Sequence, residues 1–208
     1  TRGSVARGGP VSVSLARLAR ATLVAASSAT LAGCASLYVD PTLPRVGKAD
    51  LPAVAAPRPV QLLYEFRTRG NVNARATEAT RKYAEEVVAG SGLFSAVSAT
   101  PVEGRRLLIT IDNVPLTSGA DAKTQGFITG LTLGLVGTNT TDGYLCTATF
   151  EEGGSVRAKA RAEHALHGTI GAAEAPKGAT PVPLNDAAKT VVEQLTWYVL
   201  KEIAGAMR

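Results

Sequence analysis

Residues 155–167 read Ser-Val-Arg-Ala-Lys-Ala-Arg-Ala-Glu-His-Ala-Leu-His, and they carry the clearest secondary-structure pattern in the chain. Small or apolar residues alternate in it with charged ones. One set consists of Val156, Ala158, Ala160, Ala162, His164 and Leu166, and the other of Arg157, Lys159, Arg161, Glu163 and His167. Because successive side chains of a strand point to opposite faces, this period of two predicts a long β-strand with one buried and one solvated face.

The residues just before this strand predict its partner. Glu151-Glu152-Gly153-Gly154 is a polar turn sequence whose glycines accept the backbone angles of a tight hairpin. Residues 144–150 lie on the other side of the turn. We therefore expect residues 144–150 to pair antiparallel with the strand that begins near 155.

Further strands are predicted earlier in the chain. Apolar residues alternate over 60–67 and again over 107–112, as in half-buried strands. A short piece over 93–98 lies between them and leads to a turn at 101–104. The chain therefore carries at least four segments that can share one sheet.

Two helices are predicted from apolar residues at helical spacing, over 74–89 and 186–204. Asn73 and Asn185 are their expected N-caps, since an asparagine side chain can accept a bond from the first free N–H groups. The expected apolar stripe of the first helix contains Val72, Ala76, Thr80, Tyr83 and Val87, and that of the second contains Ala188, Val191, Leu195, Val199 and Ile203.

These elements indicate an α+β fold. Each strand and each helix has a single apolar side to cover. A mainly antiparallel sheet with both helices packed on one face buries all of these sides at once. We expect residues 60–208 to form this single domain.

The N-terminus has the features of an export signal. The first 33 residues contain four arginines and no acidic residue, and an apolar run over 21–33 is too short to span a bilayer as a helix. The run ends in Leu31-Ala32-Gly33-Cys34. This sequence resembles the lipobox of bacterial lipoproteins.

The resemblance implies that residues 1–33 are a signal peptide and that Cys34 is the lipid attachment site, carrying acyl chains such as palmitate. Two or three acyl chains would hold the protein firmly in a membrane. Residues 35 and 36 are Ala and Ser, without the aspartate that retains many lipoproteins in the inner membrane, so the resemblance favours the periplasmic face of the outer membrane. The alternative is an ordinary secretory signal in which Cys34 is a plain thiol.

Five prolines punctuate the segment that follows: Pro41, Pro44, Pro52, Pro57 and Pro59. Proline density of this kind favours extended, weakly hydrogen-bonded backbone. We therefore expect residues 34–59 to be a lipidated cysteine followed by a proline-rich tether that spaces the domain from the membrane.

Composition excludes several classes of protein. With 208 residues, 45% hydrophobic and 19% charged, the chain is too apolar to be disordered, and two cysteines and two histidines exclude a disulfide scaffold. The net charge of +5 comes largely from the four N-terminal arginines, which leaves 18 basic and 17 acidic residues downstream. No nucleic-acid partner is expected.

The segment 117–143 is glycine-rich and unusual. Over 126–137 it is uncharged, and its large apolar residues are Phe127, Leu131, Leu133 and Leu135. Glycines at every fourth position would permit close helix contact, and alternation of large and small residues would suit a strand that faces lipid in an oligomer. A buried loop or strand that covers the sheet, and a subunit contact, are the other interpretations.

Catalytic patterns are absent from the sequence. His164 and His167 fall on opposite faces of the predicted strand, so a shared metal is not expected. Cys146 is expected to be a buried, unreactive thiol. No catalytic residue, metal or cofactor is therefore predicted, and the chain is not expected to be an enzyme.

The row Arg157, Lys159 and Arg161 has two interpretations. It could contact anionic lipid headgroups or an acidic partner. It could equally be an ordinary solvated strand face, because Glu163 continues the row.

The order of elements over 60–204 also resembles the small periplasmic α+β domains of outer-membrane lipoproteins, including the curli-secretion CsgG group and the N-terminal domain of TolB. This resemblance transfers no functional residue. From the lipobox-like sequence and the lack of catalytic patterns, we expect a lipid-anchored, non-enzymatic binding or envelope-assembly factor, with an envelope protein or lipid as partner. The alternative is an oligomeric lipid-handling or pore-associated subunit that uses residues 126–137.

Overall fold

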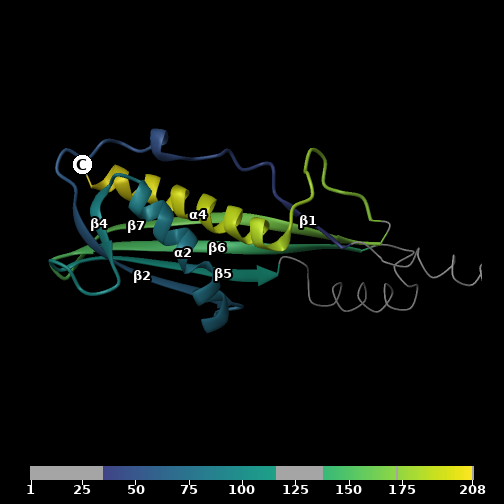
Figure 1. Ribbon diagram of the computed structural model, residues 1–208, viewed down its shortest axis with the longest axis horizontal. Helices are drawn as coiled ribbons and strands as arrows, with labels where there is room; N and C mark the ends of the chain where they lie inside the picture. Colours follow the sequence, from purple (N-terminus) through teal and green to yellow (C-terminus); the bar gives the residue numbers. More distant parts are fainter. Residues whose placement is uncertain (1–34, 116–137, 172, 208) are drawn as a thin grey trace, which may run out of the picture. The chain divides into compact units, whose positions relative to one another are not determined.

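The computed structural model describes residues 35–115, 138–171 and 173–207, all within one compact unit, Cys34–Arg208. A single sheet carries two helices (Figure 1). The strands are β1 (Ser36–Val39), β2 (Arg58–Thr68), β3 (Asn71–Val72), β4 (Phe94–Ser98), β5 (Arg105–Pro115), β6 (Thr138–Glu152) and β7 (Ser155–Ile170). The helices are the 3-10 turn η1 (Lys48–Asp50), α2 (Ala74–Gly90) and α4 (Leu184–Ala206).

The strand order is β1-β7-β6-β5-β2-β3, and β4 also pairs with β2. β1, β7, β6 and β5 pair antiparallel in that order, whereas β2 is antiparallel to β3 and parallel to both β5 and β4. The parallel pairs arise because α2 carries the chain back between β2 and β4, as a crossover between parallel strands must. The prediction of an α+β fold with a mainly antiparallel sheet is confirmed.

The predicted hairpin between β6 and β7 is confirmed. Glu152 pairs with Ser155 across the turn, and Gly153 and Gly154 both have positive φ, the backbone region that glycine adopts without strain. A bulge at Phe150 lets the strands twist just before the turn. The alternation seen in the sequence therefore sets both the length and the faces of β7.

Both helices cover the same face of the sheet (Figure 1). The side chains on this face, here called the buried face, are apolar and almost fully enclosed: Leu62 and Tyr64 from β2, Leu107, Ile109 and Ile111 from β5, and Cys146, Ala148 and Phe150 from β6. α4 adds Val191, Leu195, Val199 and Ile203 of its predicted stripe, whereas at the start of the helix Ala187 is buried in place of the predicted Ala188. The opposite face, here called the open face, carries the intervening polar and charged residues.

The stripe predicted for α2 is partly wrong. Thr80 and Val87 are buried as expected, and Ala84 and Val88 complete the face. Val72 lies in β3, before the helix, and is 62% exposed. The Asn73 cap is confirmed, because its side-chain oxygen accepts a bond from the Ala76 N–H.

Asn185 is not the N-cap of α4, which corrects the prediction. The helix begins two residues earlier than predicted, at Leu184, and Pro183 occupies the cap position without a side-chain cap bond. The φ of Pro183 is −59°, already close to the helical value, so the proline can lead directly into the first turn. The sequence pattern placed the start too late.

The prediction of a free tether over 34–59 is also wrong in its first part. Ser36–Val39 forms β1 at the edge of the sheet, paired with β7, and Tyr38 is buried. Val182 donates its N–H to the Leu37 carbonyl on the outer side of β1, and the Tyr198 hydroxyl donates to the Pro44 carbonyl. The prolines begin only at Pro41, so they do not prevent pairing before it.

Cys34 and the glycine-rich segment 116–137, with Phe127, Leu131, Leu133 and Leu135, lie outside the described residues. Their predicted roles stay predictions. Among the described helices, none is long and apolar enough to span a bilayer.

Candidate functional site

The strand ends that flank Cys34 and segment 116–137, the two parts of the chain predicted to contact a membrane, lie at one end of the sheet. Ser36, two positions after Cys34, pairs with Thr169 of β7, and Thr169 pairs with Asn139 at the start of β6. β5 ends at Pro115, opposite Asp142 of β6. The chain therefore leaves for and returns from segment 116–137 at the same end of the sheet at which β1 begins. This region is called the β1 end below.

The strands pack tightly at the β1 end. A Cβ added to Gly168 would lie 2.7 Å from Thr140 Oγ1, so any other residue there would force the threonine side chain to shift. Ile170, the last residue of β7, keeps 37% of its surface exposed. The β1 end thus combines close strand packing at Gly168 with an exposed apolar side chain at Ile170.

His164 is buried, as predicted, and bonds to α4. Its Nε2 lies 2.6 Å from Gln194 Oε1, and its Nδ1 accepts the Ala165 N–H at 2.8 Å. Burial lowers the pKa of His164, and the nearby Asp40 opposes that effect without overcoming it. These bonds suit a neutral ring that donates from Nε2 to the glutamine.

His167 lies on the other side of β7 from His164. Its Nδ1 is 3.1 Å from Thr141 Oγ1, and its Nε2 is 3.7 Å from the Asp40 carboxylate. Burial works to raise the pKa of Asp40, but hydrogen bonds from the Thr42 N–H and hydroxyl hold it below its ordinary value. No group of three or more potential metal ligands occurs among the described residues.

Cys146 lies on the buried face with Tyr144 and Ala148 and is completely enclosed. Burial raises the pKa of its thiol to about 12. A thiol is nucleophilic only as its thiolate, so Cys146 is unreactive at neutral pH.

The basic row Arg157, Lys159 and Arg161 lies exposed on the open face of β7. Arg161 forms an ion pair of 2.6 Å with Glu163, and Arg157 is 3.9 Å from Glu152. The row is therefore partly neutralised by neighbouring acids.

The outer edge of β2 has an opening that the sequence did not indicate. β4 pairs with β2 only as far as Gln61, and β3 pairs with it only from Arg67 onward. Between these points, β2 has no strand neighbour on its outer side among the described residues. We call the opening the β2 notch, defined by β2 residues 62–65 and Arg67, the α2 side chains Arg81 and Glu85, and Ala99 after β4.

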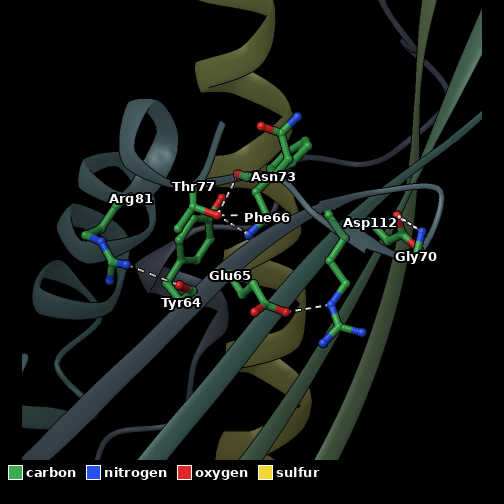
Figure 2. A network of polar contacts seen from close by, with 9 residues as sticks. Tyr64, Glu65, Phe66, Gly70, Asn73, Thr77, Arg81 and Asp112 are labelled. Atoms are coloured by element: carbon green, nitrogen blue, oxygen red, sulfur yellow. Dashed lines mark hydrogen bonds and ion pairs between the residues drawn. The ribbon is translucent and has the colours of Figure 1, made fainter. Parts of the chain in front are cut away.

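Side chains from α2 satisfy part of this free edge (Figure 2). Phe66 donates its N–H to Thr77 Oγ1 at 2.9 Å and accepts the Asn73 N–H at 2.9 Å. Arg81 donates to the Tyr64 carbonyl at 3.3 Å and stacks its guanidinium over the Tyr64 ring. The carbonyl of Leu62 and the N–H of Tyr64 point to the same edge, since alternate residues of a strand face the same side.

The β2 notch encloses about 620 Å³ and continues onto the open face beside Leu63 and Leu108. Leu63 is 37% exposed. A second hollow of about 420 Å³ adjoins it along Glu85 and Glu86. The notch therefore combines free main-chain groups, two apolar side chains and charges of both signs.

Arg81 and Glu85 are not part of the apolar stripe predicted for the first helix, and no role was predicted for them. No local spacing marks them. Only the tertiary pairing, which leaves β2 uncovered between β4 and β3, brings these two side chains to a free sheet edge.

Comparisons with known proteins give no family for this chain. No protein-family model and no curated protein matches it. Among solved structures, a PelC dodecamer from Paraburkholderia phytofirmans is 12% identical, with 80% of this chain and 98% of that chain covered and a TM-score of 0.34. A variant PelC dodecamer from the same organism has the same identity and coverage and a TM-score of 0.33.

A DUF330 protein from Xanthomonas campestris is 14% identical, with 79% of this chain and 90% of that chain covered and a TM-score of 0.39. TM-scores this low do not establish a shared fold. The resemblance in element order to the CsgG group and to TolB stays a prediction.

Proposed function

We propose that this chain is a lipid-anchored protein of the bacterial envelope that acts, without catalysis, as a binding or assembly factor on the periplasmic side of the outer membrane. The proposal combines two kinds of support: the lipobox-like sequence that ends at Cys34, and the start of β1 only two residues later. Its working surface would be the open face and the edges of the sheet.

The position of β1 carries the proposal. Two residues of chain span at most about 7 Å. A lipid on Cys34 would therefore hold the β1 end close to the bilayer, whereas a free tether of 25 residues would let the domain diffuse away from it. The exposed Ile170 and the flanks of segment 116–137 lie at this same end.

The distribution of titratable groups supports a role other than catalysis. Cys146 is enclosed and protonated, and His164 is committed to Gln194 and to its neighbouring N–H. Neither group lies beside the β2 notch. A cleft that gathers a nucleophile and a base is not found among the described residues.

The anchor and the basic row are far apart. Arg161 and Thr169 are separated by eight positions of β7, or about 26 Å at about 3.3 Å per residue. A sheet that stands on the membrane by its β1 end would hold Arg157, Lys159 and Arg161 in the periplasm. These three side chains would reach lipid headgroups only if the open face lay flat on the bilayer.

Mass spectrometry of protein from native membranes tests the anchor. We expect a mature chain that begins at Cys34 with acyl chains on it, and we expect Cys34→Ser to release the protein from membranes. The Cys146→Ser variant is the matched control and should remain membrane-bound. An intact chain that retains residues 1–33 with a bare Cys34 thiol would contradict the proposal.

Replacement of all three basic residues of the row by glutamine tests its contact with lipid. Loss of binding to vesicles with anionic headgroups would favour a sheet that lies flat. Unchanged binding would favour a standing sheet, with the row left as a solvated face or as a site for an acidic partner.

The second candidate function is an oligomeric lipid-handling or pore-associated subunit that uses residues 126–137. Its support is the uncharged sequence of that segment together with the flanks at the β1 end. An oligomer in detergent in which 126–137 is protected from protease would favour it, whereas a monomer with this segment cleaved would favour the binding factor.

A further inference from the structure

The β2 notch has the features of a peptide site. We propose that it binds a short extended segment of a partner protein in which one apolar residue separates an acidic from a basic residue. This inference rests on the proposal that the chain is a binding factor and does not depend on a lipid at Cys34.

The main chain of β2 supplies the first part of the recognition. The Leu62 carbonyl and the Tyr64 N–H face the notch, and β4 ends before it can pair with them. An extended peptide presents N–H and C=O groups at the spacing of a strand, so it can pair with this edge as an added strand does. β4 and β3 close the notch at its two ends, so only a few residues fit between them.

The charges on α2 supply the second part. Arg81 and Glu85 are one helical turn apart, which corresponds to a rise of about 6 Å. They do not form an ion pair with each other, and the Arg81 guanidinium contacts the Tyr64 carbonyl and ring. In an extended peptide, side chains two residues apart lie on the same side at a distance of about 6.6 Å.

The two spacings match. An acidic side chain beside Arg81 and a basic one beside Glu85 would both face α2, and each would meet the opposite charge. An acidic and a basic residue that are adjacent in the peptide would point to opposite sides of it, so only one of them could face the helix.

The open face supplies the third part. The residue between the two charges would point away from α2, toward Leu63 and Leu108 beside the notch. Leu63 is partly exposed, and its surface would be covered by an apolar side chain at that position. The order charged, apolar, oppositely charged follows from these contacts together.

The test uses the full chain in detergent and two fluorescent peptides of identical composition. The probe is Thr-Val-Glu-Val-Lys-Val-Thr, and the spacing control is Thr-Val-Glu-Lys-Val-Val-Thr. We expect the probe to bind and to slow hydrogen exchange at the Tyr64 amide, and we expect the control not to saturate up to about 1 mM. Equal binding of both peptides, or no binding of either, would overturn the proposal.

Four variants of α2 locate the site. Arg81→Gln and Glu85→Gln should each weaken probe binding about threefold to fivefold, the range of a partly exposed ion pair. Arg75→Gln and Glu78→Gln lie on the same helix outside the notch and should leave binding unchanged. Arg81→Met, an uncharged side chain that still covers the Tyr64 ring, replaces Arg81→Gln should that variant fail to fold. Unchanged binding in Glu85→Gln and in a folded Arg81 variant without the charge would also overturn the proposal.

Two further outcomes would mean that something other than a partner peptide occupies the β2 notch, and each would contradict the proposal. The first is strong protection of the Tyr64 amide in the free chain, equal to that of the central strand β5, which would mean that the edge is already covered. The second is a dimer of this chain that the Arg81→Gln variant dissolves. Neither outcome alters the result expected for the lipid on Cys34, so the two proposals fail independently.

Discussion

The two faces of the sheet are built from the same strands and carry opposite chemistry. On β6, Phe150 and Ala148 are enclosed under the helices, while Thr149 and Thr147 between them face the other way. On β7, Ala158 is buried and Lys159 is exposed. The buried face thus carries the free energy of folding, and the open face, free of that task, can carry charge and contacts.

The largest expected difference between the faces is in thiol reactivity. In a chain with Cys34→Ser, Cys146 should react with iodoacetamide about a thousandfold more slowly than an ordinary cysteine at about pH 8, because its pKa is raised by three units from 9.0 to about 12. Burial slows the reaction further. The rate is measured by mass spectrometry over time.

The control for this prediction moves the thiol by one residue. The variant Thr147→Cys, combined with Cys146→Ala and Cys34→Ser, presents its sulfur on the open face and should react at the rate of a free thiol. Fast labelling of Cys146 in the folded chain would mean that the buried face opens often.

Core packing gives the next largest difference. Phe150 is 2% exposed and contacts the rings of Phe94 and the guanidinium of Arg105. Phe150→Ala should lower the free energy of unfolding by about 3 to 5 kcal/mol, because it leaves a cavity beneath α2 and α4. Urea unfolding followed by circular dichroism measures this change.

Thr149→Ala is the matched substitution on the open face, one residue away. It should change the free energy of unfolding by no more than about 0.5 kcal/mol. Similar losses for the two variants would remove the distinction between the faces.

The pH dependence of stability reports on His164 at the far end of the buried face. Its pKa is lowered in the folded chain, so the folded state binds fewer protons than the unfolded state once the pH falls toward the ordinary value of 6.5. Stability should therefore be full above about pH 6.5 and decrease as the pH is lowered through the window below it. Urea midpoints between about pH 7.5 and pH 5 measure the effect.

The variant His164→Gln should flatten this part of the curve. Asp40, whose pKa is also lowered, contributes a loss of stability only below its ordinary value of 3.8, in a separate window. A curve of unchanged slope in His164→Gln would assign the effect to another group.

Most of this fold could be predicted from the sequence, because the alternation of apolar and polar residues indicates which side chains lie on each face of the sheet. The alternation from Val156 to Leu166 defined β7, and the glycine pair Gly153-Gly154 defined the turn. The start of α4 was predicted too late. Asn185 is a favourable cap residue by its side chain, but Pro183 already occupies the cap position, so the helix begins before Asn185.

Two features depended on contacts between distant segments and could not be predicted. β1 pairs with β7 across more than a hundred residues of sequence. Its four residues are too few for an alternation of apolar and polar side chains to predict a strand. The β2 notch exists only because β4 stops at Ser98 and β3 stops at Val72 on the same edge. The spacing of apolar residues predicts where a strand lies, but it does not predict where the neighbouring strands end.

The smallest expected effect is the ion pair between Arg161 and Glu163 on the open face. The two side chains are 2.6 Å apart at their charged atoms, yet they are 65% and 69% exposed, so water and salt screen most of their attraction. A double-mutant cycle with Arg161→Gln and Glu163→Gln should give a coupling free energy below about 0.5 kcal/mol that decreases further in high salt. A larger coupling that is insensitive to salt would mean that the pair is shielded from solvent in the native protein, as it would be beneath a bound partner or a second copy of the chain, and the open face would then not be open where β7 carries its charges.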